Sequence, residues 1–396
     1  MEKNILILTY WRYNDALVQT YTLPYIRQIK NKLGAGRSIY FVTLETDDTC
    51  ENPQDDLFHH IPLKYHRFGI RAILGHFFNF FFLKNLMRKK NIGIVHTWCT
   101  PAGGMGYLLT RFTPKKLILD SFEPHAEPMI ESGTWKKNGI AHRILFWLEK
   151  KQAQHAYAAI ACVPEMQEYA LNKYGACPAI FYSKPACVDH SKFNLDLVKN
   201  TQLISKYDLS DKIVCVYAGK FGGSYLTQEV FDFFKVADNY WKGGFKMILL
   251  NNHTKEEVHN WCELSGVNID QIIHEFKPHD EVPMYMGLAD FAITPFIPVP
   301  SKRYGSPIKT GEYWSLGLPV VITKNISDNS EIIKTNNIGA VLEGLNEKAY
   351  QNAIIKIDQL LKEDRDQLRS RIRNVSVKYR SFEISDRVYQ ELYSQL

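Results

Sequence analysis

A single stretch of the chain combines residues that suit a nucleotide diphosphate. Tyr304–Ile322 reads YGSPIKTGEYWSLGLPVVI, and its Ser306 and Pro307 are typical of the start of a helix, which a glycine ends before an apolar strand. The first turn of such a helix offers free amide groups and Lys309 to a phosphate. Glu312 follows on the same face, where its carboxylate can accept hydrogen bonds from the two hydroxyls of a ribose. A plain helix start in which the lysine and glutamate pair is an equally good interpretation of these residues alone.

A glycine-rich turn provides a second place for phosphate. The apolar run at 212–218 predicts a strand that leads into Gly219 and Lys220. Glycine lets the backbone approach a phosphate, and a cation beside it neutralises charge. One such turn is also explained as a tight connection that binds nothing. The evidence for a phosphate site is stronger if Lys220 and Lys309, which come from distant segments, are directed to the same phosphate.

Polar residues also follow a buried strand in the first half. The strand predicted at 116–120 leads into a loop that holds Glu123, His125 and Glu127. Open α/β sheets bind ligands at the carboxyl ends of their strands, so this loop is a candidate site. His96, at the end of another predicted strand, is at least as well explained as a hydrogen-bonded structural histidine.

Length and composition indicate a two-domain protein of ordinary globular type. A chain of 396 residues exceeds what one hydrophobic core usually serves, and 45% of the residues are hydrophobic. The net charge of +6 does not indicate nucleic-acid binding. The seven cysteines lack paired short spacing, which argues against a disulfide framework or a zinc site and favours a reducing compartment. There is no signal-peptide pattern and no long apolar run, so we expect a cytoplasmic protein.

The elements that must position these residues follow an α/β pattern. Apolar runs alternate with helical patterns, which is typical of parallel sheets with crossover helices. The strands predicted in the first half are 5–9, 38–44, 92–96, 116–120, 158–163 and 179–182. Those predicted in the second half are 212–218, 245–250, 272–275, 291–294, 319–323 and 339–342. The main helices are predicted at 17–32, 103–111, 140–156, 164–174 and 380–396.

The segment Lys64–Lys90 permits two interpretations. It has aromatic residues in its middle and basic residues at both ends. Such a helix can make peripheral contact with the inner face of an anionic membrane. We favour the alternative, an amphipathic helix that packs on its own sheet and ends in a solvated basic turn.

The motif SPxKxxEY followed by GLPVV resembles the donor-binding helix and strand of retaining glycosyltransferases of family four. These enzymes have the GT-B fold, in which two Rossmann-like domains face each other across a cleft. The chain resembles a sub-pattern of the family, because Tyr304 stands where many members have a first glutamate. A second basic residue that usually follows the glycine turn is replaced by Tyr225, and Lys309 is expected to supply its charge. The donor contacts that the resemblance implies are Gly219, Lys220, Phe276, Ser306, Pro307, Ile308, Lys309 and Glu312.

The same resemblance implies a domain organisation. The linker 184–194 is similar to the segment that closes the first domain in this family. It gives an acceptor-side domain at 1–195 and a donor-side domain at 208–378. The last helix, at 379–396, is expected to return to the first domain.

Further contacts follow from the resemblance. Phe276 and Lys277 are implied beside the nucleotide base, although core packing explains Phe276 nearly as well. His125 and Glu123 are implied to orient the sugar and the acceptor. Trp11, Arg12 and Asn14 stand where this family usually has a glycine pair, and we expect acceptor contacts from them and from Trp98. Rim residues without a task are an equally good interpretation of the first three.

The function expected from the resemblance is a retaining hexosyltransferase. It would move a sugar from a nucleotide-diphosphate sugar to a hydroxyl of a glycan or glycolipid, with no metal and no cofactor, in surface polysaccharide or glycolipid biosynthesis. The catalytic residues expected are Lys220, Lys309, His125 and Glu123. Two other classes stay open, a nucleotide-sugar epimerase of the same architecture and a non-catalytic subunit that binds a nucleotide sugar.

Overall fold

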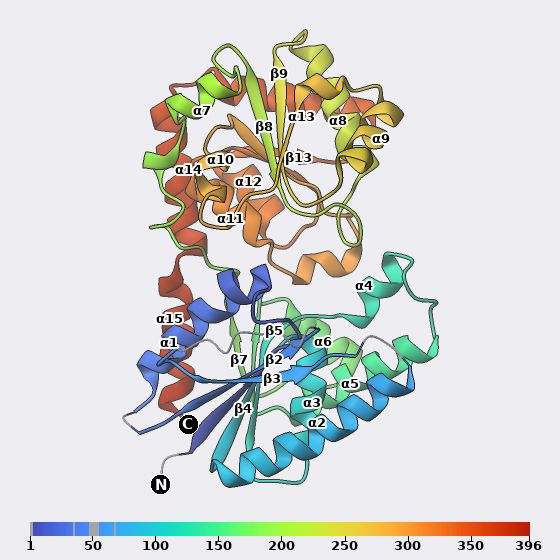
Figure 1. Cartoon of the computed structure of the whole chain (residues 1–396), viewed down its shortest axis with the longest axis vertical. Coiled ribbons are helices and arrows are strands. Elements are labelled where there is room, and N and C mark those ends of the chain that lie inside the picture. Colours follow the sequence, from blue (N-terminus) through green and yellow to red (C-terminus); the bar gives the residue numbers. More distant parts are fainter. Residues whose placement is uncertain (1–2, 35, 47–54, 67–68) are drawn as a thin grey trace. The chain divides into compact units, whose positions relative to one another are not determined.

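The chain forms two compact α/β units (Figure 1). This computed structural model describes residues 3–34, 36–46, 55–66 and 69–396. The first unit comprises Met1–Pro185 and Glu383–Leu396, and the second comprises Ala186–Phe382. Residues 186–195, which we assigned to the first domain from the sequence, therefore belong to the second unit.

The first unit is built on a parallel sheet of seven strands. Their order is β3-β2-β1-β4-β5-β6-β7, so the chain crosses outward from β1 in both directions. The strands are β1 Asn4–Leu8, β2 Ile39–Glu45, β3 His59–Lys64, β4 Ile92–Trp98, β5 Lys116–Phe122, β6 Ala158–Ala161 and β7 Ile180–Ser183. The central strands β1 and β4 are buried nearly throughout, as expected of a parallel sheet covered on both faces. Strand β3 was not among the strands predicted from the sequence.

Helices connect these strands. A π-helical turn, Val18–Thr22, leads into α1, where a single helix was expected at 17–32. The helices of this unit are α1 Leu23–Lys32, α2 Ile70–Lys89, α3 Cys99–Thr110, α4 Ala126–Glu131, α5 Ile140–His155, α6 Met166–Tyr174 and α15 Phe382–Ser394. Within the described part of the chain, no helix is both long and apolar enough to cross a membrane.

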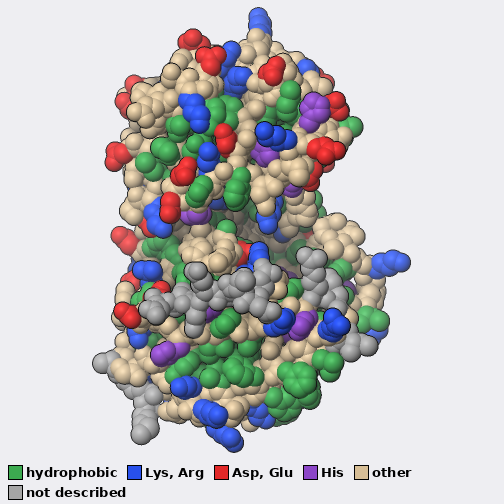
Figure 2. All heavy atoms as spheres, viewed as in Figure 1, with side chains coloured by type: hydrophobic (Ala, Val, Ile, Leu, Met, Phe, Trp, Pro, Cys, Tyr) green, Lys and Arg blue, Asp and Glu red, His purple; other side chains and the backbone are tan. Residues whose placement is uncertain are grey.

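Helix α2 packs on the unit through only part of its surface. Leu83 and Met87 are buried, whereas hydrophobic side chains gather on the molecular surface over α2 (Figure 2). The helix packs on its own sheet and ends in an exposed basic turn, as the interpretation that we favoured expects, but most of its aromatic side chains are exposed.

The last helix, α15, completes the first unit through a buried polar cluster. The hydroxyl of Tyr389 donates to Asp120 Oδ2 at 2.6 Å, and the hydroxyl of Tyr393 lies 2.8 Å from His96 Nδ1. The other oxygen of Asp120 lies 3.0 Å from Lys184 Nζ, and both of these side chains are fully buried. Because residues 383–396 supply two members of the cluster, they belong to the same unit as the sheet they cover.

The second unit repeats the plan with a parallel sheet of six strands in the order β10-β9-β8-β11-β12-β13. The strands are β8 Ile213–Ala218, β9 Phe245–Leu250, β10 Ile272–Glu275, β11 Phe291–Thr294, β12 Val320–Thr323 and β13 Gly339–Leu342. The helices are α7 Thr201–Lys206, α8 Gln228–Tyr240, α9 Lys255–Ser265, α10 Val282–Met286, α11 Ile308–Ser315, α12 Asn329–Asn336, α13 Glu347–Leu361 and α14 Arg365–Arg380. Strand order reverses between β8 and β11, and ligands bind at such switch points in open α/β sheets.

Candidate functional site

Helix α11 begins one residue later than the sequence predicted. Its N-cap is Pro307, with φ −66° and ψ 111°, a residue whose side chain makes no capping hydrogen bond. The hydroxyl of Ser306, which we expected to cap the helix, instead accepts a hydrogen bond from the amide of Ala186 at 3.0 Å. Among the described residues, no side chain accepts a hydrogen bond from the amides of the first turn, at a helix start that favours anions.

The two charged residues of α11 pair with each other. Lys309 Nζ lies 2.8 Å from Glu312 Oε2, as the interpretation without a ligand expects. The Glu312 side chain is only 3% exposed, whereas that of Lys309 is 34% exposed. The lysine holds the buried carboxylate in place and keeps a solvent-facing side, so the same pair can also receive a phosphate.

Buried hydrogen bonds fix α11 to the carboxyl edge of the sheet. The amide of Ala218, the last residue of β8, donates to the hydroxyl of Tyr313 at 2.9 Å. The hydroxyls of Thr310 and Thr294, the last residue of β11, lie 3.1 Å apart. The helix is thus held at the ends of the two strands between which the strand order reverses.

The glycine turn after β8 has the conformation that its glycines allow. Gly222 and Gly223 have φ angles of +79° and +62°, which glycine adopts readily. A Cβ on Gly219 would lie 2.9 Å from the hydroxyl oxygen of Tyr217. That hydroxyl donates to the carbonyl of Lys220 at 2.6 Å, and the Lys220 side chain is exposed. The turn therefore has a backbone conformation that favours glycine and presents the exposed cation of Lys220.

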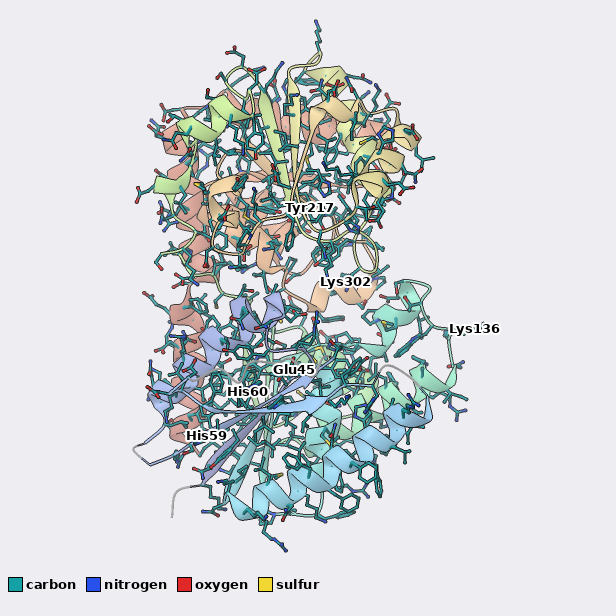
Figure 3. The ribbon with its side chains drawn as sticks, in the orientation of Figure 1. Glu45, His59, His60, Lys136, Tyr217 and Lys302 are labelled. Atoms are coloured by element: carbon teal, nitrogen blue, oxygen red, sulfur yellow. The ribbon has the colours of Figure 1, made fainter. Side chains whose placement is uncertain are left out.

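A second cation at this turn, Lys302, was not expected from the sequence. Lys302 lies in the 3₁₀ segment Pro300–Tyr304, and its Nζ donates to Ser224 Oγ at 2.9 Å (Figure 3). Tyr225, which replaces the expected basic residue, packs against Phe296 with ring centroids 4.6 Å apart. Lys302 lies two residues before the stretch Tyr304–Ile322, and its long-range hydrogen bond to Ser224 places it at the turn.

His279 is another residue that the sequence analysis missed. Burial lowers its pKa below the ordinary 6.5, and the nearby Lys309 charge lowers it further, against a smaller opposite effect of Glu312. Its buried Nε2 has no hydrogen-bond partner among the described residues. A half-buried imidazole whose pKa is lowered therefore lies within the electrostatic influence of the Lys309–Glu312 pair.

Phe276 lies at the end of β10, on the same edge of the sheet. Its side chain is 72% exposed, so core packing of Phe276 is wrong and its ring is free to stack. Lys277 pairs with Glu275 at 3.3 Å and lies over the ring of Tyr285. Aromatic faces such as that of Phe276 are suited to stacking on a nucleotide base.

In the first unit, the loop after β5 brings Glu123 and His125 together. The Nδ1 of His125 lies 2.9 Å from Thr100 Oγ1, and its Nε2 lies 3.9 Å from Glu123 Oε1. The buried carboxylate of Glu149 accepts the amides of His125 and Ala126 at 2.7 and 2.9 Å, which fixes the loop. Glu127 points elsewhere, because it binds Tyr169 and Lys173.

The expected acceptor residues divide into exposed and buried ones. Arg12 and Asn14 are exposed and Trp11 is half-buried in the loop that follows β1. Trp98 is completely buried and stacks on His96 with ring centroids 4.5 Å apart, so it is not available to an acceptor. His96 has the structural role that its sequence context also allowed.

Comparison with solved structures assigns the architecture. The chain aligns over 99% of its length with 99% of sucrose-phosphate synthase from Thermosynechococcus elongatus, at 14% identity and a TM-score of 0.75. It matches Anabaena HepE in complex with UDP over 99% of this chain and all of that one, at 12% identity and a TM-score of 0.74. WaaG, a glycosyltransferase involved in lipopolysaccharide biosynthesis, matches over 98% of each chain at 12% identity and a TM-score of 0.71. The fold is GT-B.

Sequence comparison adds one local match. A family model described as "Glucosyltransferase 3-like, C-terminal domain" matches residues 300–392. This segment begins at the 3₁₀ turn of Lys302 and includes all of α11. No curated protein sequence matches the chain.

The described residues hold no cluster of three or more His, Cys, Asp or Glu side chains that suits a metal ion. No disulfide joins the six cysteines in the part of the chain that the structure describes. The polar groups gathered at the edge of the second sheet are thus cations, helix amides, an imidazole and one buried carboxylate.

Proposed function

We propose that the chain is a glycosyltransferase that uses a nucleotide-diphosphate sugar. The observation that carries this proposal is the buried attachment of α11 to the carboxyl edge of the sheet, which holds the Lys309–Glu312 pair beside the turn of Lys220 and Lys302. The first turn of α11 and these lysines suit a diphosphate, and Glu312 suits the hydroxyls of a ribose. HepE, which has the same fold, is solved with UDP and with UDP and glucose.

In the proposed reaction, an acceptor hydroxyl attacks the anomeric carbon from the side of the departing diphosphate. The bond from that carbon to the diphosphate oxygen breaks, the bond to the acceptor oxygen forms, and the acceptor proton passes to the leaving oxygen. Configuration is retained. Lys220, Lys302, Lys309 and the helix amides stabilise the charge that develops on the leaving group, so we propose that no metal ion or cofactor is needed.

The loop of Glu123 and His125 is proposed to orient the sugar and acceptor. His125 is held by Thr100, and the fixed backbone of the loop keeps both side chains at the carboxyl edge of the first sheet. Orientation of bound reactants is a large source of rate enhancement. The acceptor is proposed to be a glycan or glycolipid of a surface polysaccharide, assembled in the cytoplasm; WaaG is described as acting in lipopolysaccharide biosynthesis.

A panel of nucleotide sugars tests the proposal. The purified protein is incubated with UDP, GDP and ADP sugars, and nucleoside diphosphate release and the anomeric configuration of the product are followed by NMR. Slow donor hydrolysis, or transfer with retention, is expected for one base. A changed sugar without nucleotide release would indicate an epimerase, and binding without turnover would indicate a binding subunit; either result overturns the proposal.

A further inference from the structure

The outer side of α2 carries an unusual number of exposed hydrophobic side chains. Six of them are between 48% and 70% exposed, namely Ile73, Leu74, Phe77, Phe78, Phe81 and Phe82. At 100° per residue, these positions share one arc of about 180° on the helix. Isolated exposed apolar residues need no explanation, but a contiguous patch of large ones marks an interaction site.

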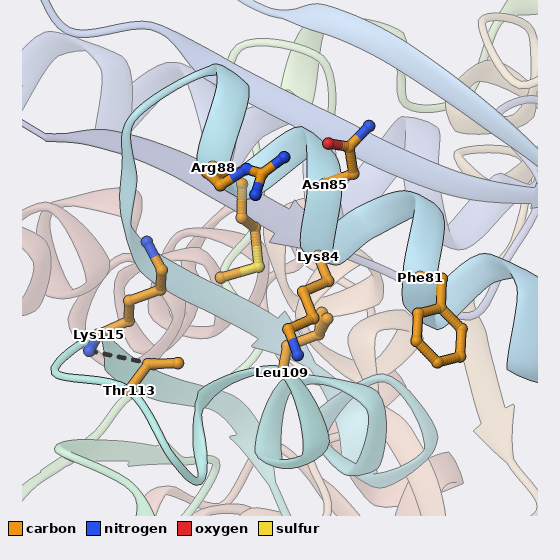
Figure 4. A pocket seen from close by; sticks show the side chains of 8 residues that line it. Phe81, Lys84, Asn85, Arg88, Leu109, Thr113 and Lys115 are labelled. Carbon is orange, nitrogen blue, oxygen red and sulfur yellow. Dashed lines mark hydrogen bonds between the residues drawn. The ribbon is translucent and has the colours of Figure 1, made fainter.

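The same arc becomes basic toward the end of the helix. Lys84, Arg88 and Lys89 continue it over the last two turns and are exposed. A hollow of about 470 Å³ opens here, with Met87 and Leu109 among its apolar lining and Lys84, Arg88 and Lys115 around them (Figure 4). The helix thus offers large apolar side chains between Ile73 and Phe82 and cations beside an apolar hollow in its last two turns.

Neighbouring helices extend this patch. Helix α2 packs on α3, and α3 packs on α5. Just after α3, Phe112 is 83% exposed with the Arg111 guanidinium 4.2 Å from its ring centroid. On α5, Ile140, Ile144 and Trp147 are 79%, 55% and 46% exposed. We use the term apolar–basic face for the exposed side chains of α2 and α5 together with Arg111 and Phe112.

This face has no exposed carboxylate on its helices. No Asp or Glu occurs in the 63 residues between Asp56 and Asp120, a stretch that holds ten Lys and Arg residues. The one acid of α5, Glu149, is buried and bound to backbone amides. A binding partner of this face must therefore be both apolar and anionic. A second copy of the same face would place cations against cations.

We propose that the apolar–basic face docks on the surface of a bilayer that contains anionic phospholipid. The aromatic side chains of α2 enter the boundary between headgroups and acyl chains, and its basic last turns contact lipid phosphates. Helix α2 lies in the plane of the surface, because it is not apolar enough to span the bilayer. The proposal does not depend on the sugar-transfer activity, since the face belongs to the first unit and is tested without donor.

Vesicle sedimentation tests the proposal with the full chain and no nucleotide present. The chain is mixed with phosphatidylcholine vesicles, with or without 30% phosphatidylglycerol by composition. We expect binding to the anionic vesicles at low salt, weak binding to the neutral ones, and weakening of the former as salt is raised.

Two variants separate the apolar and basic contributions. Phe77→Ser with Phe81→Ser, and Lys84→Gln with Arg88→Gln, are each expected to lower the partition coefficient about tenfold or more. All four side chains are exposed, so the fold should persist, which circular dichroism checks. The matched control replaces exposed hydrophobic residues elsewhere, Leu171→Ser with Leu264→Ser, and should bind as the parent does.

Three results would overturn the proposal. The first is no binding of the parent chain to anionic vesicles. The second is equal binding of the parent and both variants. The third is a dimer, seen by sedimentation velocity, that the Phe77→Ser and Phe81→Ser changes dissociate, because the face would then join two copies of the chain.

Discussion

The hydroxyl of Tyr313 accepts a hydrogen bond from the amide of Ala218 at 2.9 Å, and both groups are buried. This bond joins the middle of α11 to the last residue of β8. Lys309 lies one turn before Tyr313, and Lys220 lies two residues after Ala218. One buried contact therefore sets the relative positions of the two segments proposed to hold the diphosphate.

Replacing Tyr313 with Phe should weaken both folding and catalysis. The change leaves the Ala218 amide buried without an acceptor, at a cost of about 1–3 kcal/mol. We expect a lower urea midpoint and a turnover number reduced by more than the nucleoside diphosphate affinity. Tyr350→Phe, in the same unit, is the control. A Tyr313→Phe chain with unchanged stability would show that the bond is not formed.

Glu312→Gln and Lys309→Met should separate ribose binding from phosphate binding. Glu312→Gln keeps the size of the side chain but weakens hydrogen bonds to the ribose, so we expect weaker binding of the whole nucleotide. Lys309→Met removes charge at the diphosphate, and we expect the larger loss in turnover. Calorimetry and initial rates measure the two effects. Lys334→Gln, which opens an exposed pair with Glu343, should change neither.

Lys302→Met should lower the affinity for a nucleoside diphosphate about tenfold, which is the size expected for one charge-assisted contact. The loss should shrink as salt is raised, because screening already weakens the charge. Arg303→Met is the control, since the neighbouring guanidinium is exposed and lies 5.9 Å from the Tyr304 ring centroid. Equal losses in both variants would mean that only the overall charge matters.

The free energy of unfolding of the first unit should decrease in two steps as the pH is lowered. Burial lowers the pKa of His96 below 6.5, so the unfolded chain takes up this proton first and stability decreases as the pH falls below about 6.5. Burial alone would raise the pKa of Asp120, but Lys184 and hydrogen bonds from His96 and Tyr389 lower it to about 2 from 3.8. Stability is thus lost again as the pH falls from 3.8 toward 2. Urea titrations should show that His96→Gln makes the first step smaller; part of it should remain, because burial also lowers the pKa of His60, His76 and His155.

Lys184→Met should destabilise the first unit strongly. It leaves the Asp120 carboxylate buried without its cation, which typically costs about 3–5 kcal/mol. Lys32→Met is the matched control, because Lys32 also pairs with an aspartate, Asp386 of α15, but at a more exposed site. Opening that pair should cost no more than about 1 kcal/mol. Similar urea midpoints for the two variants would contradict the role given to the buried cluster.

Sequence patterns identified what is local and missed what depends on distant contacts. The strands of both sheets and the helix of Lys309 and Glu312 follow from apolar runs and from residues typical of helix starts and ends. Strand β3 was missed because its sequence, HHIPLK, has a proline and the exposed positions of an edge strand. Lys302 was missed because its place at the glycine turn depends on a hydrogen bond to Ser224, which is 78 residues away along the chain.

The burial of individual side chains also could not be predicted from the sequence. The aromatic run of α2 has the composition of a core helix, yet most of its phenylalanines are exposed. Trp98 was expected to contact the acceptor, yet its side chain is completely buried. Periodicity indicates which residues share a side of a helix, but not whether another element covers that side. His279 was missed for the same reason, since what distinguishes it is a buried ring nitrogen that has no hydrogen-bond partner among the described residues.

The contribution of α15 to the first unit has a consequence for biosynthesis. The segment Glu383–Leu396 leaves the ribosome only after the whole of the second unit, yet His96 and Asp120 each depend on one of its tyrosines for a hydrogen bond. The first unit therefore cannot complete its buried polar cluster until the second unit has been synthesised. Translation that stops short of Tyr389 should yield a nascent chain that chaperones retain and proteases degrade.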